Sequence, residues 1–212
     1  MVCLKKGRVV NLKFLNYATF FVVKNKILII STVFLIFGLI FGILSFKKFD
    51  LLFNFIESYV EHYFSIRNSS KITEIFINSF FESFGLIFLI FYFGTSMFGI
   101  IFIPFLITLK GYLYGATAAF LYWKYSINGI ALNAVLILPT AIFFIIALLL
   151  SSCEAFEFSF TLAYQTFSFG EYKNLSLYFK NYCYKHILFI VLLIISAITD
   201  ALISVNFSTN FL

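Results

Sequence analysis

The stretch that decides the fold is LITLKGYLYGATAAF, residues 106–120, in which a lysine interrupts an almost continuous apolar run directly before a glycine. Composition shows what surrounds this lysine: 62% of the residues are hydrophobic, 11% are charged, and the mean hydropathy is +1.03. A water-soluble domain usually has about a quarter of its residues charged, and it could not bury this much apolar surface. The lysine is therefore expected inside a membrane-spanning segment.

A helix that crosses a bilayer needs about 20 mainly apolar residues, because lipid offers the backbone no hydrogen-bond partners. The segments that meet this requirement are residues 27–46, the two halves of 75–123, 129–150 and 186–205. The long run 75–123 is divided by a turn-like cluster, FGTSMFG, at residues 93–99. Pro139 removes a backbone hydrogen bond from the fourth segment and predicts a kink there.

The segment 151–185 is polar at both ends, and we predict that it is cytoplasmic. A short sixth crossing through residues 156–169 is the alternative. It would begin beside Glu154 and Glu157 and would place three lysines outside, against the tendency of basic residues to remain in the cytoplasm. We therefore expect an all-α, polytopic membrane helix bundle with about five transmembrane helices.

Basic residues also predict the orientation of the chain. The first 26 residues contain six Lys or Arg residues and no acid, whereas residues 47–82 contain four basic and five acidic residues. This difference predicts a cytoplasmic N-terminus. We then expect one integral membrane domain, 1–212, with these parts: a basic cytoplasmic N-terminus 1–26, an extracytoplasmic amphipathic segment 47–74, a membrane core 75–150, a cytoplasmic segment 151–185 and a last crossing 186–205.

The outer segment contains an amphipathic helical pattern at residues 49–64. Its polar residues Asp50, Asn54, Glu57 and Glu61 recur at helical spacing, and apolar residues share the other side. One interpretation is a helix that lies on the outer leaflet. The other is a docking face that contacts an extracytoplasmic partner through Glu57 and Glu61.

Lys110 and Asp200 are expected at similar depths in the third and last crossings. Each lies about 13 residues from the inner end of its segment, or roughly 20 Å at 1.5 Å per residue. An isolated charge at that depth costs several kcal/mol. We therefore predict an intramembrane ion pair between Lys110 and Asp200. The alternatives are that each charge separately reaches the interface or a polar cavity, or that both serve a mobile ion relay.

Small residues form stripes in two of the predicted crossings. Gly111 and Gly115 are four residues apart in the third crossing, and Gly38 and Gly42 have the same spacing in the first. In lipid, such stripes allow helix backbones to approach closely. We expect these glycines to pack helices within one chain, with a contact between two copies as the alternative.

Motifs that carry chemistry are absent from the sequence. It contains no His-Glu-x-x-His zinc motif, no Gly-x-Ser-x-Gly elbow and no phosphate-binding loop. Cys3, Cys153 and Cys183 lack the spacing of metal ligands, and we interpret His62 and His186 as lone polar anchors. No catalytic residue, cofactor or metal is predicted. The net charge of +6 is explained by orientation and by attraction to anionic lipid, without nucleic acid.

The central block, residues 93–160, resembles the stage II sporulation protein M family. The resemblance rests on the following residues: Gly94 and Gly99 around the tight turn, Lys110 with Gly111 and Gly115, Gly129, Leu138 with Pro139, and the small and apolar stretch that ends at Ser159. The basic N-terminus and the acid near the outer end of the last crossing, Asp200, are similar too. Members often show Leu-Pro-Gln-Asn where this chain has Leu-Pro-Thr-Ala at 138–141.

The resemblance implies a non-enzymatic, multi-pass protein of the bacterial cell membrane that acts at the sporulation septum during engulfment of the forespore. It also implies a scaffold that anchors two peptidoglycan-degrading proteins, stage II sporulation proteins D and P. The main alternative is a transporter or permease subunit with a midplane site near Lys110, although the internal repeat common in transporters is not evident. An intramembrane hydrolase is a more distant alternative, because no nucleophile and base are evident as a pair.

Overall fold

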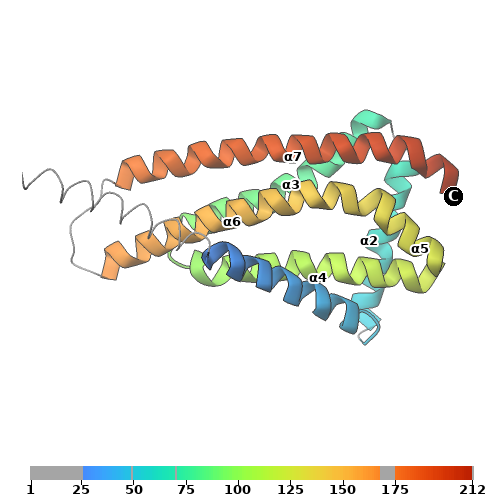
Figure 1. Ribbon diagram of the computed structural model, residues 1–212, viewed down its shortest axis with the longest axis horizontal. Helices are drawn as coiled ribbons and strands as arrows, with labels where there is room; N and C mark the ends of the chain where they lie inside the picture. Colours follow the sequence, from blue (N-terminus) through green and yellow to red (C-terminus); the bar gives the residue numbers. More distant parts are fainter. Residues whose placement is uncertain (1–25, 49, 70, 168–174, 212) are drawn as a thin grey trace, which may run out of the picture.

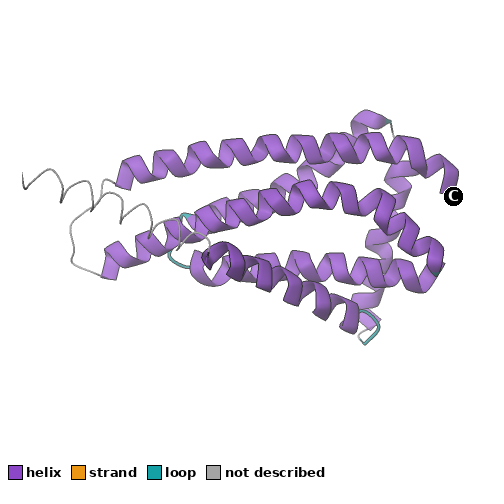
Figure 2. Cartoon of the chain, viewed as in Figure 1, coloured by secondary structure: helices purple, strands orange, loops and turns teal. Residues whose placement is uncertain are grey.

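The computed structural model describes residues 26–48, 50–69, 71–167 and 175–211. Throughout these ranges the chain forms helices joined by short turns, with no strand (Figure 2). In chain order the helices are Lys26–Ser45, α2 (Asp50–Ser69), α3 (Ile72–Gly94), α4 (Gly99–Tyr125), α5 (Ile127–Leu132), the π-helical turn η1 (Asn133–Ile137), α6 (Leu138–Phe167) and α7 (Leu175–Phe211). The all-α prediction is confirmed.

Among the described residues, five helical segments are long and apolar enough to cross a membrane. They are Lys26–Ser45, Ile72–Gly94, Gly99–Tyr125, Ile127–Phe167 and Leu175–Asn206. Large apolar side chains such as Ile101 and Phe81 are exposed on the outside of the bundle, as lipid contact requires. The expectation of about five transmembrane helices is confirmed.

The helices at the polar segment 151–185 are longer than the sequence indicates. Helix α6 continues to Phe167, and α7 already begins at Leu175, so residues 156–167 extend the fourth span and form no separate crossing. The polar residues Ser151, Ser152 and Glu154 are buried inside the bundle, which a hydropathy profile cannot anticipate. The predicted N-terminal segment 1–26 lies outside the described residues except for Lys26.

Pro139 lies two residues beyond the end of the π-helical turn η1, at the second position of α6. A proline has no N–H to give to the preceding turn, and a wider π-helical turn accommodates that loss. Figure 1 shows the chain bending between α6 and α5 at this place. The kink predicted at Pro139 is thus accompanied by a π-helical turn. Ile137, the last residue of that turn, lines the cavity inside the bundle.

The long helices lie side by side, and α2 crosses them near the end that carries α5 and the C-terminus of α7 (Figure 1). Helices α3, α6 and α7 pack against one another, and α4 packs against α3 and α6. The core contains fully buried aliphatic residues from these helices, including Ile90, Ile107, Leu148 and Leu193. The amphipathic stretch predicted at residues 49–64 lies almost entirely in α2, and this helix contacts α3, α4 and α7.

The predicted glycine stripes face each other across a seam between the helix Lys26–Ser45 and α4. A Cβ atom added to any of the four glycines would lie within 3.0 Å of a backbone oxygen of the opposite helix. The pairs are Gly38 with Thr108, Gly42 with Tyr112, Gly111 with Leu35 and Gly115 with Leu39. The structure therefore places these residues in packing contacts within one chain.

Gly115→Ala should destabilise the bundle by about 1–3 kcal/mol, because its new methyl group meets backbone that cannot move aside. The matched control is Gly85→Ala on α3, since nothing lies within 4 Å of an added Cβ there. This control should be neutral or should stabilise by about 0.5–1 kcal/mol through helix propensity. Reversible unfolding in detergent micelles measures both; equal effects at the two positions would argue against the seam.

Candidate functional site

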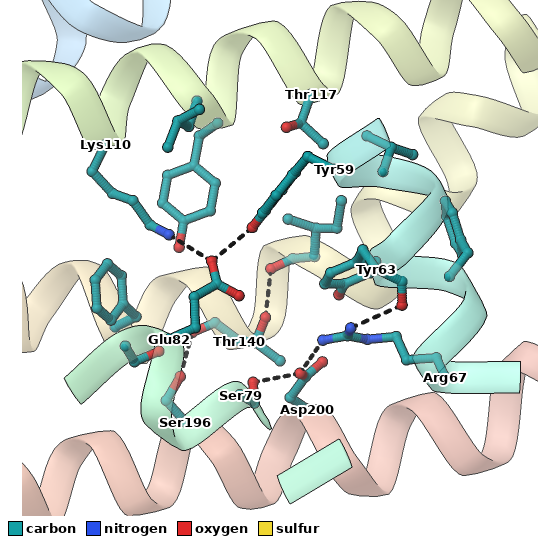
Figure 3. A pocket seen from close by; sticks show the side chains of 17 residues that line it. Tyr59, Tyr63, Arg67, Ser79, Glu82, Lys110, Thr117, Thr140, Ser196 and Asp200 are labelled. Atoms are coloured by element: carbon teal, nitrogen blue, oxygen red, sulfur yellow. Dashed lines mark hydrogen bonds and ion pairs between the residues drawn. The ribbon is translucent and has the colours of Figure 1, made fainter. Parts of the chain in front are cut away.

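Helices α2, α3, α4, α6 and α7 converge on a polar cavity of about 50 Å³ (Figure 3). Four charged residues line it: Arg67 of α2, Glu82 of α3, Lys110 of α4 and Asp200 of α7. The cavity is also lined by residues with hydroxyl groups: Tyr59, Tyr63, Ser79, Ser83, Tyr114, Thr117, Thr140 and Ser196. Of the four buried charged residues in the part of the chain that the structure describes, Arg67, Lys110 and Asp200 thus share this cavity, whereas Glu154 lies elsewhere and pairs with Lys185.

Arg67 and Asp200 form an ion pair that links α2 to α7. Arg67 Nη2 donates to Asp200 Oδ2, and the two side chains are only 8% and 2% exposed. Arg67 Nη1 donates to the Tyr63 carbonyl at 3.1 Å, and the guanidinium lies over the Tyr63 ring. Asp200 Oδ2 also accepts from Ser79 Oγ at 2.5 Å, while Oδ1 accepts from Ser204 at 3.4 Å. These contacts replace the hydration that both charges lose on burial.

Lys110 and Glu82 form a second ion pair, which links α4 to α3. Lys110 Nζ donates to Glu82 Oε1 at 3.1 Å and lies 5.2 Å from the ring centroids of both Tyr114 and Phe144. Tyr59 of α2 donates its hydroxyl to the same Glu82 oxygen at 2.7 Å. The lysine side chain is 9% exposed and the glutamate side chain 44%. Glu82 therefore lies at the margin of the cavity, and Lys110 lies inside it.

The predicted ion pair of Lys110 with Asp200 needs correction, because each residue has a different partner. Both line the same cavity, as their similar depth suggests, but Glu82 pairs with Lys110 and Arg67 pairs with Asp200. Arg67 and Glu82 both lie in the stretch 47–82, whose mixed charges predict a location on the outer face. Glu82 nevertheless lies within the apolar run that begins at Ile75, and a charge inside a predicted crossing is the signal that could have identified it.

Tyr59 and Tyr63 of α2 remain protonated hydrogen-bond donors at neutral pH. Burial raises the pKa of the Tyr59 phenol, and the neighbouring Glu82 carboxylate raises it further. Burial likewise raises the pKa of the Tyr63 phenol, although the adjacent Arg67 opposes this effect. Neither phenol adds a negative charge to the cavity.

Glu57 and Glu61, the predicted partner contact, both approach Lys124 near the end of α4. The distances from Lys124 Nζ are 3.6 Å to Glu57 Oε1 and 3.1 Å to Glu61 Oε1. The two carboxylates remain 35% and 61% exposed. On the neighbouring face of α2, Ile56 and Val60 are buried in a cluster with residues of α4. The acidic face of α2 is thus anchored to α4 and still accessible.

His186 is not the lone polar anchor that the sequence suggested. Its Nδ1 lies 3.0 Å from the Tyr182 carbonyl, which can only accept, so Nδ1 carries the hydrogen. In the neutral imidazole, Nε2 then accepts from Ser151 Oγ at 3.0 Å. Ser151 lies in the middle of α6, where backbone N–H groups are engaged in the helix and cannot stabilise an oxyanion. The pair holds α6 and α7 together, and because its members are 35 residues apart, no local motif indicates it.

The cavity is suited to water-sized occupants. Its volume of about 50 Å³ is close to the space of one or two water molecules, each of which takes about 30 Å³ in the liquid. Pockets that bind small organic ligands usually have about 300–1,000 Å³. Within the described parts of the chain, no cluster of three or more His, Cys, Asp or Glu residues could hold a metal ion.

Comparison with known proteins gives one family match. The family model described as "Stage II sporulation protein M" matches residues 31–205. This region includes both ion pairs, the glycine seam and all of α2 to α6. No curated protein and no solved structure matches the chain.

Asp200→Asn should destabilise the bundle by about 3–5 kcal/mol, because the buried charge of Arg67 would lose the carboxylate with which it forms its ion pair. The double variant Arg67→Met with Asp200→Leu removes both charges and should recover most of this loss. Glu61→Gln, which alters an exposed pair, is the control and should cost less than about 1 kcal/mol. Unfolding of the four proteins in lipid nanodiscs measures the differences; a double variant no better than Asp200→Asn would refute the pairing.

Proposed function

Because the chain belongs to the stage II sporulation protein M family, we propose that it is the membrane scaffold of a cell-wall-remodelling complex in endospore formation. In this proposal it anchors peptidoglycan-hydrolysing proteins, stage II sporulation proteins D and P, during engulfment of the forespore. The chain itself catalyses no reaction. Its place is the sporulation septum, where it is embedded as a multi-pass membrane protein.

The observation that carries this proposal is the internal pairing of the charged core. Arg67 pairs with Asp200 and Lys110 pairs with Glu82, around a cavity of about 50 Å³. Charges paired around so small a cavity leave little room for a substrate and stabilise one arrangement of helices. Such a bundle is suited to presenting fixed surfaces to partner proteins.

The proposed orientation places α2 on the side of the cell wall. With a cytoplasmic N-terminus, the helix Lys26–Ser45 ends on the outer side, as do α4 and α7. Helix α2, the α4–α5 turn and the C-terminal end of α7 then face the compartment that contains peptidoglycan. The exposed carboxylates of Glu57 and Glu61 would be available to a partner there.

A transporter or permease subunit is the second candidate, and one observation favours it. Lys110 lies in a polar cavity within the membrane-spanning part of the chain, where transporters bind their substrates. The scaffold proposal instead requires that the cavity opens no route through the bundle. Measured transport separates the two functions.

Purified full-length chain in liposomes should show no uptake of protons, K⁺ or glucosamine above empty liposomes. The physical reason is that the paired charges and the small cavity offer no continuous wet passage. Fluorescent dyes for pH and K⁺ and radiolabelled glucosamine provide the measurement. Uptake that Lys110→Met abolishes would favour the transporter and would contradict the scaffold.

Glu57→Lys with Glu61→Lys should lower the recovery of D and P proteins in co-purification by at least about tenfold, since it reverses the acidic face of α2. The double change also repels Lys124, so the control adds Lys124→Glu, which re-forms these ion pairs with opposite polarity. If the acidic face contacts a partner, the triple variant should remain defective although α2 is anchored again. Normal recovery with the triple variant would exclude Glu57 and Glu61 as partner contacts.

A further inference from the structure

Helix α3 carries two polar residues and a glycine along the edge of its exposed face, beside the margin of the cavity. Asn78, Glu82 and Gly85 are exposed and follow one another at helical spacing. Exposed apolar residues surround them, namely Ile77, Phe81, Phe88, Leu89 and Tyr92. We call Asn78, Glu82 and Gly85 the α3 stripe. A polar stripe on the lipid-facing side of a membrane helix is costly unless something covers it.

Glu82 gives the stripe an unused hydrogen-bond acceptor. The hydroxyl of Tyr59 and the ammonium of Lys110 both donate to Oε1, and no described residue donates to Oε2. Glu82 is ten residues from the start of α3, about 15 Å along the helix. That depth lies within a hydrocarbon core of about 30 Å, where an acceptor without a donor costs free energy.

Gly85 gives the stripe room for a neighbour. Nothing lies within 4 Å of a Cβ added to Gly85, whereas the four seam glycines each press against backbone. A glycine in a helix interior costs about 1 kcal/mol relative to alanine, and the described fold gives it no packing role in return. In membranes, a glycine on a helix surface allows a second helix to approach closely.

We propose that the α3 stripe binds a single membrane-spanning helix of another protein. That helix presents a neutral hydrogen-bond donor, a Ser, Thr, Asn or Gln side chain, to Glu82 Oε2 and packs a small residue against Gly85. The inference rests on the proposed scaffold function and states where a partner is held within the membrane.

The charges at the stripe favour a neutral donor on a different protein. The pair Glu82–Lys110 is neutral as a whole, so an added Lys or Arg would leave an uncompensated charge in lipid. A second copy of this chain fits poorly. In a two-fold symmetric dimer in one membrane, both copies of α3 would place Glu82 at the same depth, where the carboxylates would face each other.

The experiment places a photo-crosslinking amino acid at Phe81 or Phe88, which flank the stripe, in full-length chain expressed with full-length D and P proteins. The same amino acid at Phe105, on the exposed side of α4, is the control. Adducts with D or P from the stripe and not from Phe105 support the proposal. Adducts only between two copies of this chain, or only from Phe105, overturn it.

Gly85→Leu tests the same contact. The measurement is the amount of D and P proteins that co-purify with the chain. The substitution has open space around it, so the bundle should fold as before, and recovery should fall at least about tenfold. Ser176→Leu enlarges an exposed residue of α7 outside the stripe and should leave recovery unchanged. Unchanged recovery with Gly85→Leu overturns the docking site and leaves the scaffold function standing. If the wild-type chain recovers neither D nor P, both proposals fall.

Discussion

The pairing of charges inside an apolar bundle is the constraint on which the rest of the structure depends. A charged side chain in lipid needs a partner of opposite charge, since water is not there to solvate it. Arg67 with Asp200 links α2 to α7, and Lys110 with Glu82 links α4 to α3. Tyr59 joins the second pair to α2, so this short helix contacts both pairs. The pairs thus select one arrangement among the many that apolar helices could adopt in lipid.

Close backbone packing supplies the second constraint. Hydrophobicity does not drive helices together within lipid, so contact between small residues takes over that role. Gly111 and Gly115 bring α4 against the helix Lys26–Ser45, while Lys110, next to Gly111 in sequence, faces the cavity. Neighbouring faces of α4 therefore serve two purposes, a seam on one side and an ion pair on the other. This answers why a lysine precedes a glycine in the middle of an apolar run.

The sequence was sufficient to predict the all-α bundle and its five spans, because apolar length and turn residues are local signals. It also placed Lys110 and Asp200 at a common depth, and both line the cavity. Depth alone could not identify their partners, since it says nothing of the direction in which each helix face points. Arg67 reaches the cavity only because α2 crosses the bundle, and no local pattern shows where a helix will cross. The contact of His186 with Ser151 depends on tertiary packing in the same way.

These features together describe a membrane support whose charged groups at the cavity form ion pairs with one another. Both ion pairs need an ionised carboxylate within the membrane, at Glu82 and at Asp200, because each stands opposite a cation. Infrared spectroscopy of the chain in lipid at neutral pH, compared with Glu82→Gln and Asp200→Asn, tests this directly. We expect each substitution to reduce the absorption of ionised carboxylates. The absorption of protonated carboxyl groups should not change. A protonated carboxyl band that disappears with either substitution would contradict the account.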